Sequence, residues 1–192
     1  MRRLYDGFTF VIFTLNFFNK MDKFIIVGKA ASGKDWLQKE MIKRGYVPMK
    51  QYTTREMREN ETGNEYHFIS QEEFEHMKEE GRFISANFYR IGWYGISYDE
   101  LINSDVAILS PANVNDIISA FPQIRDIFKI IYLDIPISIR RERLNSRYRN
   151  KIGDDNEVRI MNDEKDFKDF TIWDIRLDGV ESINDFLTSV LP

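Results

Sequence analysis

The chain has 192 residues, a length that suits one domain of medium size or a core with small inserted segments. It contains no cysteine, which excludes a disulfide scaffold, a thiolate nucleophile, an iron–sulfur cluster and a zinc site built on sulfur. The formal net charge of −4 argues against nonspecific binding of duplex nucleic acid as the main task. No apolar run reaches transmembrane length, so we expect a cytoplasmic protein with no membrane partner.

The first twenty residues differ from the rest of the chain. Arg2 and Arg3 precede an apolar stretch, 8–18, that would span about 16 Å as a helix, against about 30 Å of membrane hydrocarbon. Three interpretations stay open: a disposable arm, a targeting segment, or an extension upstream of a natural start at Met21. The last interpretation explains why a compact strand pattern begins directly after Met21.

Strands and helices are expected to alternate along the rest of the chain. The apolar run 23–27 predicts a buried strand, and residues 51–66 are polar and predict a loop or arm. A helix is expected at 34–44, with its packed side formed by Trp36, Leu37, Met41 and Ile42.

The later elements follow the same alternation. Capping-box patterns that begin at Ser70 and Ser97 predict two helix starts. The remaining elements are expected in this order: strands at 106–109 and 128–133, a basic helix at 137–147, a helix up to about 167, a strand at 171–175 and a helix at 183–190. This alternation predicts an α/β fold with a parallel sheet and right-handed crossovers.

Residues 28–35 fit the pattern G-x-x-x-x-G-K of a phosphate loop, directly after the first strand and before the first helix. The glycines let backbone N–H groups turn inward around a β-phosphate, and Lys34 adds a charge between the β- and γ-phosphates. The plain alternative is a glycine turn that binds nothing. The expected ATP-binding residues are Gly28, Lys29, Ala30, Ala31, Ser32, Gly33, Lys34 and Asp35.

Asp35 stands where such loops usually carry serine or threonine. A carboxylate is still a good ligand for a hard cation, directly or through water. The expected cofactors are therefore ATP and Mg²⁺, with Asp35 as the expected metal ligand.

Two groups further along the chain suit phosphate chemistry. Arg55 and Arg58, three residues apart, can each donate two parallel hydrogen bonds to a dianionic phosphate, and the hydroxyls of Tyr66 and Tyr94 can complete its shell. The alternatives are a solvated loop for the arginines and core or rim packing for the tyrosines.

The basic helix carries Arg140, Arg143 and Arg147 at i, i+3 and i+7, which places them on one face, and Arg159 continues the charge. A solvated helix face and a nucleic-acid surface are the alternatives. The functional interpretation is a mobile lid whose arginines close over transferring phosphates and exclude water.

The order of these motifs resembles the guanylate kinase family over nearly all of residues 22–190. After the phosphate loop come T-T-R-x-x-R at 53–58, E-G-x-F-I at 80–84 and Y-G at 94–95. The resemblance implies a P-loop NTPase three-layer fold with two inserted pieces. It also implies that Arg55, Arg58, Tyr66 and Tyr94 hold the acceptor phosphate, and that the catalytic residues are Lys34, Arg55, Arg143, Arg147 and Arg159.

The positions that read guanine in this family are largely replaced. Without gaps, the family's serine before T-T-R becomes Gln51, its glutamate becomes Ser85, and its aspartate falls at Ala112; its hydroxyl after Y-G becomes Ile96, with Ser97 next to it. We therefore hypothesise a shifted or relaxed base preference. The full expected acceptor set is Gln51, Arg55, Arg58, Tyr66, Ser85, Tyr94 and Ser97.

The sequence thus predicts an ATP-dependent kinase of GMP, dGMP or a related nucleoside monophosphate, monomeric or homodimeric, with small nucleotides and no nucleic acid as partners. A deoxynucleotide, pyrimidine or sugar-phosphate kinase stays open, as does a non-catalytic guanylate kinase-like module that binds proteins. The expected division is an extension at 1–20, a core at 21–50, 98–144 and 161–192, an acceptor arm at 51–97 and a lid at 145–160.

Overall fold

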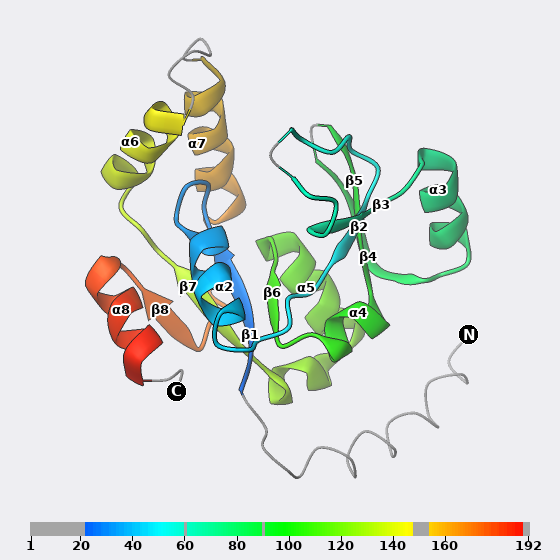
Figure 1. Ribbon diagram of the computed structural model, residues 1–192, viewed down its shortest axis with the longest axis horizontal. Coiled ribbons are helices and arrows are strands. Elements are labelled where there is room, and N and C mark those ends of the chain that lie inside the picture. Colours follow the sequence, from blue (N-terminus) through cyan, green and yellow to red (C-terminus); the bar gives the residue numbers. More distant parts are fainter. Residues whose placement is uncertain (1–21, 60, 90, 148–153, 190–192) are drawn as a thin grey trace.

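The structure is a computed structural model that describes residues 22–59, 61–89, 91–147 and 154–189. The expected extension at 1–20, the start at Met21 and the 148–153 part of the expected lid lie outside these residues. The described chain forms two four-stranded sheets joined through their connecting helices (Figure 1).

The first sheet is parallel and has the order β6-β1-β7-β8. Its strands are β1 (Lys23–Gly28), β6 (Val106–Ile108), β7 (Phe128–Leu133) and β8 (Ile175–Leu177). Continuous apolar runs suit such strands because both faces of a parallel sheet are covered. The predicted strands at 23–27, 106–109 and 128–133 are confirmed.

The strand expected at 171–175 is wrong in position, because β8 begins only at Ile175. The preceding aromatic residue is used for packing instead: the Trp173 ring lies 5.6 Å from that of Tyr132, centroid to centroid. The Asp174 carboxylate accepts a hydrogen bond from the Ile130 backbone N–H at 2.7 Å. The strand-like composition of residues 171–174 therefore belongs to the segment that leads into β8, and not to the strand itself.

Helices cover both faces of this sheet, which confirms the α/β three-layer arrangement. On one face pack α2 (Lys34–Ile42) and α8 (Val180–Ser189), and on the other α5 (Pro111–Ala120) and the 3₁₀ turn η1 (Pro122–Asp126). Trp36 and Ile42 were expected on the packed side of α2 but are 48% and 40% exposed, and only Leu37 and Met41 are buried. Residues four apart share a helix face, so this short helix buries one narrow stripe.

The second sheet lies within the expected acceptor arm at 51–97, and its first strand falls in the segment 51–66 that was predicted as a polar loop or arm. It has the order β3-β2-β5-β4, formed by β2 (Gln51–Thr53), β3 (Tyr66–Phe68), β4 (Phe83–Tyr89) and β5 (Gly92–Ser97). Two short helices adjoin it, α3 (Gln71–Glu79) and α4 (Tyr98–Asn103). Both capping boxes are confirmed: the Ser70 hydroxyl accepts from Glu73 N–H at 3.1 Å, and that of Ser97 from Glu100 N–H at 3.2 Å.

The two faces of the second sheet carry different kinds of side chain. A β-bulge between Phe83 and Ser85 changes which face the side chains of β4 point to. The back face is aromatic and packs on Phe74 of α3; it carries Tyr52, His67, Phe83 and Trp93. The opposite face, which we call the front face, carries Gln51, Thr53, Tyr66, Phe68, Ser85, Asn87, Tyr94 and Ile96 according to the register. The bulge directs Ser85 to the front face, since it breaks the alternation of side chains along β4.

Helices α6 (Ile137–Arg147) and α7 (Asp154–Asp166) project from the first sheet as a hairpin (Figure 1). Their base is joined by Arg140, whose side chain is 1% exposed and forms ion pairs with Asp163 at 3.4 Å and Glu164 at 2.7 Å. The predicted basic helix at 137–147 is confirmed. Among the described residues no helix has the length and apolar character needed to span a bilayer.

Candidate nucleotide-binding site

The loop 28–35 connects β1 to α2 as the sequence predicted. Two of its residues have left-handed backbone, Ala31 with φ +58° and Gly33 with φ +105°. For a non-glycine residue such as Ala31 this conformation costs about 1 kcal/mol, and such strain is retained mainly at functional sites. Gly33 then opens α2, since its carbonyl accepts from Leu37 N–H at 2.9 Å.

Two cationic side chains lie on this loop. The Lys34 ammonium donates to the carbonyl oxygens of Gly28 at 2.6 Å and Lys29 at 3.0 Å. The Arg143 guanidinium reaches the loop from α6 and donates to the carbonyl oxygens of Ala31 at 3.1 Å and Ser32 at 3.2 Å. The structure therefore brings together two expected catalytic residues that are more than a hundred positions apart in the sequence, Lys34 of the loop and Arg143, which was expected to act from a lid.

Arg55 is the centre of a second group, on the front face of the other sheet. Its guanidinium donates to the Tyr94 hydroxyl at 3.0 Å and makes a two-pronged ion pair with the Glu61 carboxylate at 2.7 and 2.5 Å. The guanidinium also stacks over the rings of Tyr66 and Phe68, at 4.9 and 5.3 Å from their centroids. Arg55 is thus held rigidly among the residues expected to bind an acceptor phosphate.

The contact between Arg55 and Glu61 shifts the pKa values of both side chains. The hydrogen bond from Arg55 lowers the pKa of the Glu61 carboxyl, and the same bond raises the pKa of the guanidinium, so both stay charged. Burial raises the pKa of the Tyr66 phenol, and the charge of Asp35 in the phosphate loop acts in the same direction.

A polar cluster adjoins the Arg55 group where β4 packs on α5. The Ser85 hydroxyl donates to Asp116 Oδ2 at 2.8 Å and accepts from the amides of Asn87 and Asn113, at 2.9 and 2.8 Å. Asn87 is the direct cross-strand partner of Tyr94, so the cluster and the Arg55 group share the front face. The cluster is a candidate site for the base of a nucleotide whose phosphate lies at Arg55.

Asp116 is not among the residues expected from the sequence, because the expected elements do not include α5. The signal was present, since Ser110-Pro111 is a typical helix start: the Ser110 hydroxyl caps Asn113 N–H at 3.2 Å and the proline occupies the first turn. From that start, Asn113 and Asp116 are three residues apart on one helix face.

The other expected residues are more dispersed. Gln51 lies between the sheets and donates to the Ile108 carbonyl at 3.0 Å, while Arg58 is exposed and its backbone N–H donates to Glu61 at 2.9 Å. Arg159 is half-buried on α7, and Arg147 ends α6, its side chain lying outside the described part of the chain. Ser97 caps α4 and is not brought next to Tyr94.

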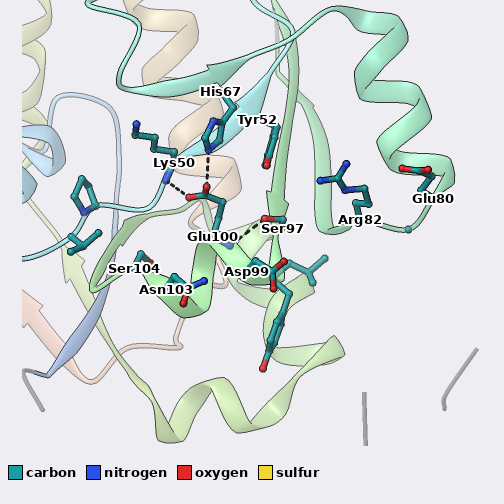
Figure 2. A pocket seen from close by; sticks show the side chains of 15 residues that line it. Lys50, Tyr52, His67, Glu80, Arg82, Ser97, Asp99, Glu100, Asn103 and Ser104 are labelled. Carbon is teal, nitrogen blue, oxygen red and sulfur yellow. Dashed lines mark hydrogen bonds and ion pairs between the residues drawn. The ribbon is translucent and has the colours of Figure 1, made fainter. Parts of the chain in front are cut away.

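Ser97 instead lines a separate cavity of about 570 Å³ behind the second sheet (Figure 2). There His67 meets Glu100 at 2.7 Å, and the same carboxylate accepts from the Lys50 backbone N–H at 3.3 Å. Tyr52 and His67 of this cavity belong to the back face, so the cavity is separated from the Arg55 group by the sheet itself. These contacts join the second sheet to α4.

Metal ligands are sparse: in the described ranges, no three His, Asp or Glu side chains are grouped so that they could hold an ion. Asp35 is exposed at the start of α2. An ion bound with a nucleotide needs only one or two carboxylates, because phosphates and water supply the remaining oxygens. Asp35 therefore suits a Mg²⁺ ion that arrives bound to ATP.

A parallel sheet, a glycine-rich phosphate loop after its first strand and a lysine at the loop's end together define a P-loop nucleotide-binding protein. The sequence profile of the guanylate kinase family matches residues 20–110. This stretch of the chain, which includes the phosphate loop and the Arg55 group, is similar to guanylate kinases.

The individual proteins to which this chain is similar include guanylate kinases. A guanylate kinase of Bdellovibrio bacteriovorus is 27% identical over 166 residues, which cover 80% of this chain and 85% of the relative. One of Rhodopirellula baltica is 36% identical over 83 residues, 40% of each chain. The crystal structure of guanylate kinase from Anaplasma phagocytophilum shares the fold, with a TM-score of 0.57 and 18% identity, over 89% of this chain and 86% of that one.

Proposed function

We propose that the protein is a cytoplasmic nucleoside monophosphate kinase that transfers the γ-phosphate of ATP to GMP, dGMP or a related nucleoside monophosphate. The observation that carries the proposal is the pairing of two anion sites. Lys34 and Arg143 gather at the phosphate loop, and Arg55, Tyr66 and Tyr94 form a second group on the front face of the other sheet. A donor triphosphate and an acceptor monophosphate are the ligands that two such sites suit.

The reaction needs no general base, because the attacking phosphate oxygen is already ionised at neutral pH. Catalysis then consists of positioning and charge neutralisation. Lys34 would neutralise the donor phosphates, and Arg55 would orient the acceptor phosphate while Glu61 holds the guanidinium in place. Arg143, with Arg147 and Arg159, would surround the transferring group when the 145–160 lid closes on the core.

Asp35 is the residue that would hold Mg²⁺, directly or through water. When bound, the ion would neutralise charge on the donor phosphates. Asp35 would orient that ion while leaving the backbone N–H groups of the loop to the phosphates.

For the acceptor base we propose a reading cluster that replaces the family's usual one. In the described part of the chain, the Ser85 hydroxyl is saturated, while Asp116 Oδ1 and Asn87 Oδ1 accept no hydrogen bond. Two open acceptors suit a base edge with two adjacent donors, which is the N1–H and 2-amino edge of guanine. Asp116 would thereby supply the carboxylate that is missing at Ala112, and guanine is the first base to test.

Replacing Asp116 with alanine tests this cluster. A hydrogen bond to a charged group contributes about 1.5–3 kcal/mol, so we expect kcat/KM for GMP to fall about ten- to hundredfold while the KM for ATP is unchanged. Asn115→Ala, an exposed neighbour on α5, is the matched control and should leave both values unchanged. If the two variants have the same kcat/KM for GMP, Asp116 does not take part in recognition of the base.

The function itself is tested by ADP formation from ATP and Mg²⁺ with GMP, dGMP, AMP, CMP, UMP and dTMP in turn. We expect turnover with at least one of them, guanylates first. A purified, folded protein that forms no ADP with any of the six would overturn the proposal and leave the protein-binding module. A strict preference for guanine would reject the shifted or relaxed preference inferred from the replaced positions.

A further inference from the structure

Trp36 is an exposed aromatic residue beside the phosphate loop. It lies in the first turn of α2, two positions after Lys34, and is 48% exposed although it was expected on the packed side of this helix. The other two tryptophans, Trp93 and Trp173, are half-buried and pack against neighbouring rings. Among the described residues, Trp36 has no ring partner of this kind. Core packing therefore does not account for its position.

Helix geometry directs the Trp36 side chain toward the loop. In an α-helix the bond from Cα to Cβ is tilted toward the N-terminus, so a long side chain covers the turn that precedes its own residue. The turn that precedes Trp36 contains Gly33, the N-cap of α2. The Arg143 guanidinium also lies beside Gly33, since a Cβ built on this glycine would be 3.7 Å from Arg143 Nη1. The exposed indole and Arg143 therefore border the same end of the phosphate loop.

A nucleoside triphosphate held by this loop has a base to place as well as its phosphates. Residues 28–35 contain no aromatic side chain, and the side chains of Lys34 and Arg143 contact the loop through cationic groups that suit phosphates. Nucleobases in proteins stack on aromatic rings, and any base can do so because every base has a π-face. Along the chain, Trp36 is the exposed aromatic residue nearest to the loop. It supplies the flat apolar surface that the loop itself lacks.

We propose that the indole of Trp36 is the stacking surface for the base of the donor nucleotide. This inference rests on the proposed use of the loop for a donor triphosphate. The phosphates of such a ligand bind at the N-terminus of α2, so its nucleoside comes within reach of an indole on the first turn of that helix. Trp36 then contributes to ATP affinity through the base alone, while Lys34 and the N–H groups of the loop act on the phosphates.

The test compares ATP with inorganic tripolyphosphate, which has the phosphates but no base. Each is titrated with Mg²⁺ and without an acceptor into the full-length protein, for the wild type, Trp36→Ala and Trp36→Phe. We expect Trp36→Ala to bind ATP about tenfold more weakly, because the stacking contact is lost, and to bind tripolyphosphate as the wild type does. Trp36→Phe keeps an aromatic ring and should bind ATP within about threefold of the wild type.

Ile42→Ala is the matched control, because Ile42 is another exposed apolar residue, at the far end of the same helix. This control should bind both ligands as the wild type does. Thermal melting checks that each variant is folded, and Trp36→Phe serves if the alanine variant is not.

The outcomes separate this proposal from the proposed function. Unchanged ATP binding by Trp36→Ala overturns the stacking surface, even if the wild type forms ADP normally. Equal weakening of ATP and tripolyphosphate binding also overturns it, because the loss then lies in the shape of the loop. Weaker binding of ATP alone supports it even if no monophosphate is phosphorylated, a result that would count only against the kinase.

Discussion

Replacing Lys34 with alanine should remove nearly all phosphoryl transfer, with kcat lower by about a hundred- to a thousandfold, as when one preorganised donor to a transition-state charge is lost. Lys34 ends the phosphate loop, and its ammonium already lies within the loop on the carbonyls of Gly28 and Lys29. A small rotation of the side chain would move this charge onto bound phosphates. The measurement is the rate of ADP formation at saturating ATP and acceptor.

The fold should survive this change. The Lys34 side chain is half-buried and donates to carbonyl oxygens of the loop, whereas the core beneath α2 is built from Leu37 and Met41. The melting temperature should therefore stay close to that of the wild type. Lys39→Ala, an exposed change in the last turn of α2, is the control and should keep normal turnover. Near-normal turnover of Lys34→Ala would contradict the assignment of the donor site.

The first sheet could be predicted because its physical signal is local. The run Phe24 to Val27 is buried on both sides, so continuous apolar character alone identifies the strand. The following glycine-rich pattern then determines the loop and the start of α2. The capping serines were equally local, since a capping box involves only four consecutive residues.

The second sheet could not be predicted in the same way. Strands β2 and β3 are three residues long, and their front faces carry polar or half-buried residues that serve a site rather than a core. The pairing of β2 with β5 depends on contacts across 40 residues, such as the hydrogen bond from Thr53 Oγ1 to the Trp93 carbonyl. The short strands therefore resemble a polar loop in sequence.

The candidate site was predicted in part. Arg55, Tyr66 and Tyr94 stood out by residue type and motif order, and the structure gathers them, but the partner that fixes Arg55 depends on the fold. Glu61 is one of several acidic residues in a charged segment, and only the loop conformation selects it. Asp116 likewise becomes part of the front face only because α5 packs on β4.

Replacing Arg55 with alanine should lower kcat/KM for the acceptor by about a hundred- to a thousandfold while ATP binding is unchanged, because a preorganised cation facing the acceptor phosphate is lost. Arg125→Ala is the matched control, since Arg125 makes a similar two-pronged ion pair with Asp174 far along the sequence from both sites. The control should leave kcat/KM unchanged. An Arg55 variant with the same acceptor kinetics as Arg125→Ala would contradict the acceptor site.

The Arg55 variant should also be less stable, and that effect has to be separated from binding. The Arg55 side chain is 2% exposed and Glu61 is 14% exposed, and removing one partner of a buried pair costs about 3–5 kcal/mol because the other charge is left unpaired. Adding Glu61→Gln removes that unpaired charge, so the double variant should regain much of the lost melting temperature. It should not regain acceptor turnover, because the amide at 61 restores no cation for the phosphate. If turnover returned together with stability, Arg55 would act by holding the 55–61 loop in shape rather than by contacting the acceptor.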